Sequence, residues 1–139
     1  MDNKKVKITV QTTVNETIED VWKIWTSPND IIYWNNASDD WHTTKAKNDL
    51  KVGGKFSYRM EAKDGSFGFD FEGIYDIVKT NELIAYTMAD GRKSIITFKQ
   101  QNNAINISQT FEAESENPIE LQKNGWQAIM NNFKKYIEN

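Results

Sequence analysis

The sequence predicts an α+β fold in which a curved antiparallel sheet of about six or seven strands wraps around one long C-terminal helix. In the middle of the chain, short segments alternate apolar and polar residues and are separated by tight-turn signals. Each segment places its apolar residues on one face, which is typical of an antiparallel sheet with one dry face. Residues 117–138 instead repeat their apolar residues at helical spacing.

The N-terminal part predicts one strand and two short helices. Residues 4–14 alternate between apolar and polar side chains, which indicates a strand. Thr17 is expected to cap a helix that ends near Thr26, because a threonine hydroxyl can accept a hydrogen bond from the first turn. Pro28 ends that helix, since the residue before a proline avoids the helical region, and residues 29–34 predict a second short helix.

An antiparallel meander is predicted for the central part of the chain. After an irregular stretch with a candidate edge strand near Thr43, the expected strands are residues 55–63, 67–78, 83–89, 92–100 and 104–113. Asp64-Gly65 and Asp90-Gly91 predict hairpins, of which the first is expected to be a type I′ turn. Links of two to four residues cannot join parallel strands, so the order is antiparallel. In the strand 67–78, Tyr75 and Ile77 are expected on the inner face.

The last helix is predicted to begin with Asn117 as its N-cap and Pro118 at its first helical position. Its apolar face consists of Ile119, Trp126, Ile129, Met130, Phe133 and Ile137. A helix of about 20 residues is roughly 30 Å long, which is enough to cross a small domain. A concave sheet is therefore expected to cover its aromatic face.

Length and composition narrow the class of protein. The 139 residues predict a single domain, 1–139, and the absence of cysteine excludes disulfides and thiolate chemistry. A net charge of −3 gives no general attraction to nucleic acid or to anionic membranes. The sequence contains neither a signal-peptide pattern nor about 18 consecutive apolar residues, so we expect a cytoplasmic protein with no membrane span.

Five Trp, five Tyr and seven Phe leave two interpretations open: the rings fill a core, or they form the walls of a cavity. The candidate cavity-lining residues are Trp34, Trp41, Phe56, Tyr58, Phe69, Phe71, Tyr75, Tyr86, Met88, Phe98, Gln122, Trp126, Met130 and Phe133. The phenols carry most weight, because a buried phenol requires a hydrogen-bond partner. Gln122 lies four residues before Trp126 and is expected either to anchor a ligand or to be solvated near the helix start.

Catalytic and metal chemistry have few candidate residues. His42 is the single histidine, which excludes histidine-rich metal sites; it could act as a general base or lie on the surface. Strand parity places Asp70 and Glu72 on the wet face, away from any cavity. The nucleophile-elbow, phosphate-loop and zinc-protease motifs are missing from the sequence. We therefore expect no catalytic residue, metal or cofactor.

The order of elements resembles the helix-grip arrangement of the START-like superfamily, also called SRPBCC or birch-pollen-allergen-like. Four stretches carry the closer resemblance: Glu19-Asp20-Val21-Trp22 with Ser27-Pro28, Leu50-Lys51-Val52-Gly53-Gly54-Lys55-Phe56, Phe71-Glu72-Gly73-Ile74-Tyr75-Asp76-Ile77, and Gly125-Trp126-Gln127 with Asn132-Phe133. They are similar to the branch that includes the C-terminal domain of the activator of the heat-shock-protein-90 ATPase.

The resemblance implies non-enzymatic binding of a small hydrophobic molecule, such as a lipid, sterol or polyketide, between sheet and helix. Two alternatives remain: a chaperone-cofactor or other protein-interaction role, with a chaperone or a second copy of the chain as partner, and a cyclase- or hydrolase-type enzyme of the same superfamily. The eukaryotic activator has a further N-terminal domain that does much of the chaperone binding. This chain has no room for it, so the resemblance does not imply chaperone activation.

Overall fold

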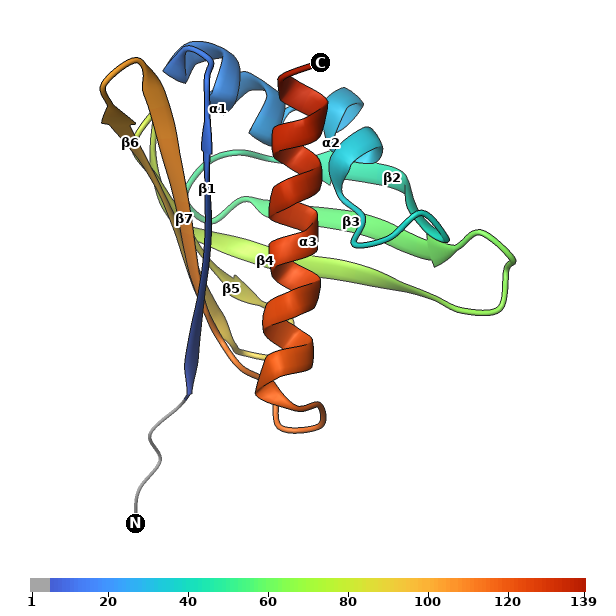
Figure 1. Ribbon diagram of the computed structural model, residues 1–139. Helices are drawn as coiled ribbons and strands as arrows, with labels where there is room; N and C mark the ends of the chain where they lie inside the picture. Colours follow the sequence, from blue (N-terminus) through green and yellow to red (C-terminus); the bar gives the residue numbers. More distant parts are fainter. Residues whose placement is uncertain (1–5) are drawn as a thin grey trace.

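Seven antiparallel strands form one curved sheet that wraps around the long helix α3 (Figure 1). This computed structural model describes residues 6–139. The elements are β1 (Lys7–Val14), α1 (Ile18–Thr26), α2 (Pro28–Trp34), β2 (Trp41–Asn48), β3 (Lys55–Ala62), β4 (Gly68–Lys79), β5 (Leu83–Met88), β6 (Lys93–Gln101), β7 (Ala104–Glu112) and α3 (Ile119–Ile137). The predicted start of the first strand at residues 4 and 5 lies outside the described residues.

The sheet order β1-β7-β6-β5-β4-β3-β2 makes β1 and β2 the two edges. The strands from β2 to β7 pair with their sequence neighbours, and β1 pairs with β7. Helix α3 crosses the concave face, and α1 and α2 lie near its C-terminal end (Figure 1). The predicted α+β helix-grip architecture is confirmed.

Aromatic packing holds α3 against the two short helices. The Trp25 ring centroid lies 4.8 Å from that of Trp34 and 4.9 Å from that of Phe133, and 5.9 Å from that of Phe98 on β6. The pairs of Trp25 with Phe98 and Phe133 are edge-to-face, and such pairs contribute about 0.5–1.5 kcal/mol beyond the burial of their area. These four rings therefore join α1, α2, α3 and the sheet at one end of the molecule.

Polar side chains of α3 bind the free edge of β1. Gln127 donates from Nε2 to the carbonyl oxygen of Gln11 at 2.9 Å, and its Oε1 accepts from the Gln11 amide at 3.3 Å. The Lys134 ammonium donates to the carbonyl oxygen of Thr13. An edge strand leaves alternate backbone groups unpaired, and these contacts satisfy several of them. One side of α3 is thus held at the β1 edge.

The predicted inward position of Ile77 is wrong because β4 contains a bulge. Tyr75 pairs with Tyr86 whereas Ile77 pairs with Ala85, so one extra residue lies between them on β4. A bulge reverses the alternation of side chains beyond it. Ile77 is consequently 41% exposed on the outer face, and Val78 packs against the core instead.

The predicted type I′ turn at Asp64-Gly65 is also wrong, although both predicted hairpins exist. A type I′ turn requires positive φ at both central residues. Gly65 has φ of 78° and Gly91 has φ of 93°, but the aspartate before each glycine does not have positive φ. The glycines are still required, because other residues rarely adopt this backbone conformation.

Helix α3 begins one residue later than expected. Its N-cap is Pro118, which makes no side-chain cap bond, and its first residue is Ile119. Asn117 instead donates from its backbone amide and its Nδ2 to Oε1 of Glu114, at 2.7 and 2.8 Å. The predicted capping role of Asn117 is wrong, because its side chain is directed to Glu114 and the helix has no side-chain cap bond.

We predict opposite effects for two glycine-to-alanine substitutions. A Cβ at Gly73 would lie 2.6 Å from the ring of Phe56 and 2.9 Å from the Thr87 carbonyl oxygen. Phe56 is buried and cannot swing away, so Gly73→Ala should lower the free energy of unfolding by about 1–3 kcal/mol. A Cβ at Gly125 in α3 meets nothing within 4 Å. Gly125→Ala should therefore raise the free energy of unfolding by about 0.5–1 kcal/mol.

Urea denaturation of the two variants and the wild type measures both changes. An unchanged or raised stability for Gly73→Ala would contradict the close packing of Phe56 against β4.

Candidate functional site

A cavity of about 290 Å³ lies between the concave face of the sheet and α3. Residues of all three helices and of strands β2 to β7 contribute to its walls. Small-molecule pockets in proteins commonly have volumes of about 300–1,000 Å³, so this cavity is near the lower end of that range. It can hold a small organic molecule in its present shape.

Most of the predicted lining residues do line this cavity. They are Trp34, Phe56, Tyr58, Phe69, Phe71, Tyr75, Tyr86, Trp126 and Met130. Neighbouring rings of this wall are in contact: the Phe56 centroid lies 4.8 Å from that of Tyr86 and 5.6 Å from that of Phe71, which lies 5.9 Å from that of Trp126. The sequence left open whether the aromatic rings fill a core or form cavity walls. In the structure they do both, since they pack against one another and also surround a gap. Their contact with a ligand stays a prediction.

The structure places four other predicted residues outside the cavity walls. Phe98 of β6 and Phe133 of α3 pack against Trp25 of α1, and this cluster holds the helices against the sheet. Met88 is buried in the hydrophobic core at the end of β5. Trp41 packs against Phe69 near the end of the β3–β4 hairpin, with ring centroids 6.0 Å apart. Inward strand parity therefore did not distinguish cavity walls from core packing.

Gln122 is buried but binds the protein itself, so neither predicted role is correct. Its Oε1 accepts from the Glu114 amide at 2.9 Å. Its Nε2 donates to the carbonyl oxygens of Glu114 and Asn117, at 3.2 and 2.8 Å. Both amide atoms are thus occupied in holding the loop before α3 against the helix, and Gln122 does not line the cavity.

Two phenols of the cavity wall, Tyr75 and Tyr58, are buried. The Tyr75 hydroxyl donates to Oδ1 of Asn48, and Asn48 donates from Nδ2 to the Thr26 carbonyl oxygen at 2.7 Å. Burial, with the neighbouring Tyr75 and Tyr86, raises the pKa of Tyr58 well above its ordinary value. Burial also raises the pKa of Tyr75. Both phenols are therefore neutral at physiological pH.

The third phenol belongs to a separate polar group. Gln109 is buried and donates from Nε2 to the hydroxyl oxygens of Tyr86 and Ser94, at 3.1 and 3.0 Å. Burial raises the pKa of Tyr86 to about 12. Like the first two phenols, Tyr86 supplies a neutral hydroxyl to the cavity wall rather than a base.

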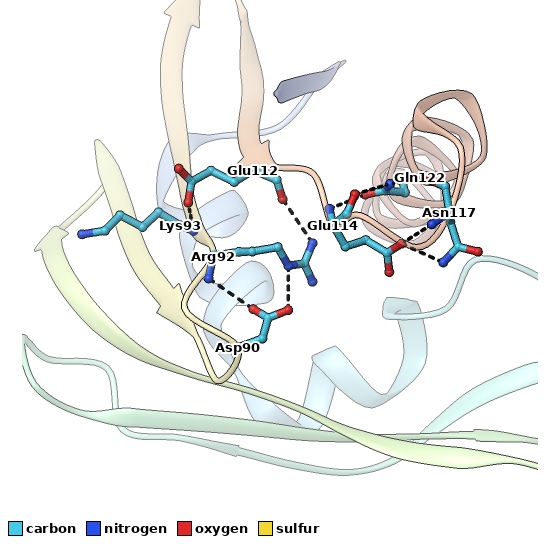
Figure 2. Close-up of polar contacts among 7 residues, drawn as sticks. All are labelled: Asp90, Arg92, Lys93, Glu112, Glu114, Asn117 and Gln122. Carbon is cyan, nitrogen blue, oxygen red and sulfur yellow. Dashed lines mark hydrogen bonds and ion pairs between the residues drawn. The ribbon is translucent and has the colours of Figure 1, made fainter. Parts of the chain in front are cut away.

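Sequence reasoning missed two charged residues and one tryptophan in the cavity wall: Arg92, Glu114 and Trp25. Trp25 could have been found from the apolar face of α1. Arg92 donates from Nε to Oδ2 of Asp90 at 2.7 Å and from Nη1 to the Glu112 carbonyl oxygen at 3.1 Å (Figure 2). Burial raises the pKa of the Asp90 carboxyl, but the hydrogen bonds from Arg92 outweigh this effect and leave the pKa lowered.

The candidate catalytic groups lie away from the cavity. His42 is on the edge strand β2 opposite Glu61 and does not line the cavity. Asp70 faces Arg59 on the other side of the sheet, with 3.6 Å between Oδ1 and Nη1, and Glu72 shares that face of β4. The wet-face positions expected for Asp70 and Glu72 are as observed.

Residues 15–138 match the family described as Activator of Hsp90 ATPase homolog 1-like protein. The chain belongs to this family. Membership confirms the resemblance that the four sequence stretches indicated. No curated protein matches the chain. Within residues 6–139, none of the helices has the length and apolar character needed to cross a membrane.

Two solved structures of related proteins support both the family and the fold. The AHSA1-like protein of Aeromonas hydrophila is 41% identical, with a TM-score of 0.90 over 96% of this chain and 92% of that one. A protein of Cytophaga hutchinsonii is 55% identical, with a TM-score of 0.84 over the same shares. A protein of Chromobacterium violaceum, 20% identical, shares the fold with a TM-score of 0.85 over 96% and 99% of the two chains.

We predict that Tyr86 makes the stability of this AHSA1-like protein depend on alkaline pH. Its pKa is about 12 in the folded state and about 10 when unfolded, so the folded state holds the proton more tightly. The stabilisation is complete below pH about 10 and is lost as pH rises toward 12. In Tyr86→Phe, the loss of unfolding free energy over this range should be smaller by about 1–3 kcal/mol.

Urea denaturation at several pH values measures this difference. Tyr136 also titrates there, because its hydrogen bond to Asp30 raises its pKa to about 12. Tyr136 is present in both proteins, so the contribution of Tyr86 is the difference in pH dependence of the unfolding free energy between Tyr86→Phe and the wild type. Equal pH dependence in Tyr86→Phe and the wild type would contradict the burial of the phenol as a neutral group.

Proposed function

We propose that this AHSA1-like protein binds a small, mainly apolar molecule in the cavity between the sheet and α3. The observation that supports the proposal is a gap of about 290 Å³ whose aromatic and aliphatic walls are held in place by packing and hydrogen bonds. An apolar pocket with a few placed polar groups is the usual form of a small-molecule site. Transfer of apolar surface from water into such a pocket contributes about 25 cal/mol per Å².

The chemistry of the walls favours binding over catalysis. The three phenols of the cavity have raised pKa values and are held by Asn48 and Gln109, so they remain neutral hydrogen-bonding groups. A general base must be able to take up a proton near the working pH. His42, the single histidine, lies outside the cavity walls.

Filling the cavity should abolish binding. Ile129 lines the cavity from α3, so Ile129→Trp places a larger side chain in the space of the ligand. Leu121→Trp, on the same helix, adds the same ring at a position that is 58% exposed and away from the cavity. We expect 1-octanol to shift the methyl NMR signals of cavity residues such as Ile84 in the wild type and in Leu121→Trp. The affinity should fall at least tenfold in Ile129→Trp.

Native mass spectrometry of protein purified from its own host complements this titration. An additional mass that leaves on denaturation, and that is missing from Ile129→Trp, would support a resident ligand. Unshifted cavity signals in the wild type, with a bare native mass, would refute the proposal.

A second candidate function is protein interaction through the outer face of the sheet. The bulge in β4 turns Ile77 outward, and Ala85 connects it across β5 to Ile95 on β6, which is 38% exposed. Exposed apolar patches of this kind mark interaction surfaces in many proteins. The family description, which refers to an activator of the Hsp90 ATPase, indicates a chaperone as the partner to test.

Replacement of both isoleucines tests this second function. Ile77→Thr with Ile95→Thr keeps β-branched side chains on the strands but removes the apolar surface. We expect the double variant to weaken binding to the host's Hsp90 at least fivefold in a calorimetric titration. Val52→Thr, at an exposed loop position, is the control and should bind like the wild type. Equal affinity of the double variant and the wild type would contradict this role of the outer face.

A further inference from the structure

Two oppositely charged side chains line one end of a cavity that is otherwise mostly apolar. Arg92 directly precedes β6, and Glu114 follows β7 by two residues. These strands pair with each other up to Ser94 and Phe111, which brings both charged residues to the same end of the sheet. Figure 2 shows the guanidinium of Arg92 directed toward the side on which Glu114 lies.

Arg92 retains a free hydrogen-bond donor after its contacts within the protein are counted. Its Nε binds Asp90 and its Nη1 binds the carbonyl oxygen of Glu112. Within residues 6–139, Nη2 makes no hydrogen bond. Arg92 and Tyr86 line the same cavity, and the positive charge of Arg92 opposes the rise that burial causes in the pKa of Tyr86.

Glu114 retains a free acceptor in the same way. Its Oε1 accepts both hydrogen bonds from Asn117, at 2.7 and 2.8 Å. Its backbone is held by the amide of Gln122. In the described part of the chain, Oε2 has no hydrogen-bond partner. The carboxylate is thus held in position, with one oxygen available to a bound molecule.

The charge at this end of the cavity disfavours an anionic ligand. The Arg92 guanidinium is already paired with the Asp90 carboxylate, so Glu114 leaves one net negative charge among these three groups. A ligand carboxylate would gain a donor from Arg92 but would face the Glu114 carboxylate. A neutral group that carries both an acceptor and a donor can bind Arg92 and Glu114 together.

We propose that the cavity selects short amphiphiles with a neutral head group that both accepts and donates hydrogen bonds, of which a primary carboxamide is the simplest. This inference rests on the proposed binding function. The amide oxygen would accept from Nη2 of Arg92, and the amide nitrogen would donate to Oε2 of Glu114. The apolar chain would lie against residues such as Ile84 and Ile96. A volume of about 290 Å³ favours a short chain over a sterol.

Octanamide and octanoate test the head-group preference, since they share one alkyl chain and differ in charge at neutral pH. Their affinities for the wild-type protein are measured by NMR titration of the cavity methyl groups. We expect octanamide to bind at least tenfold more tightly than octanoate. Nuclear Overhauser contacts should place the amide head near Glu114 and the terminal methyl group near Ile84.

Glu114→Gln should reverse this preference. The glutamine carbonyl oxygen can keep the hydrogen bonds from Asn117, and its Nε2 then faces the ligand as a donor in place of Oε2. Octanoate affinity should rise and octanamide affinity should fall, by factors whose product exceeds the wild-type preference. Glu116→Gln removes the same charge from an exposed position of the same loop outside the cavity walls, and it should leave the ratio of the two affinities unchanged.

The outcomes separate this inference from the function on which it rests. Equal or tighter binding of octanoate by the wild type, or an unchanged ratio in Glu114→Gln, would overturn the head-group selection while leaving the cavity a binding site. Failure of octanamide, octanoate and 1-octanol alike to shift the cavity signals would overturn both. Reversal of the preference in Glu114→Gln but not in Glu116→Gln is the expected result.

Discussion

The uneven attachment of α3 to the concave sheet is the constraint on which the site depends. Hydrogen bonds from Gln127 hold the helix to the backbone of the edge strand β1, and Phe133 anchors its C-terminal half in the aromatic cluster of α1 and α2. Such contacts satisfy backbone groups that an edge strand would otherwise leave unpaired. Toward its N-terminal half, Trp126 packs against Phe71 of β4 and Phe111 of β7, and together with Ile129 it borders the gap that remains between helix and sheet.

The walls of this gap are closely packed, and their buried polar atoms are hydrogen-bonded within the protein. Phe56 occupies the space that a side chain at Gly73 would take, which couples β3 to β4 at the centre of the wall. Among the described residues, every buried side-chain nitrogen and oxygen has a hydrogen-bond partner. A ligand is therefore not needed to satisfy the interior. At one end of the gap, Arg92 and Glu114 each retain a hydrogen-bonding atom without a partner among the described residues.

Strand parity and helical spacing allowed much of the site to be predicted. They placed Phe56, Tyr58 and Tyr86 on the inner face of the sheet, where all three line the cavity. They failed at Ile77, because a bulge is invisible in an otherwise regular alternation. Gln122 was misjudged for a different reason: the carbonyl groups it binds belong to a loop whose path the sequence pattern does not specify.

Local sequence by itself determined the order of the elements, the direction of the strands and the existence of a long aromatic helix, since these follow from periodicity and short links. Only the tertiary structure decided which rings became core and which became cavity wall. Phe133 and Met130 have the same helical signature, but Phe133 meets Trp25 and Trp34 whereas Met130 also borders the gap. The pairing of β6 with β7 likewise brought Arg92 near Glu114, because contacts between residues distant in sequence depend on strand register rather than on local pattern.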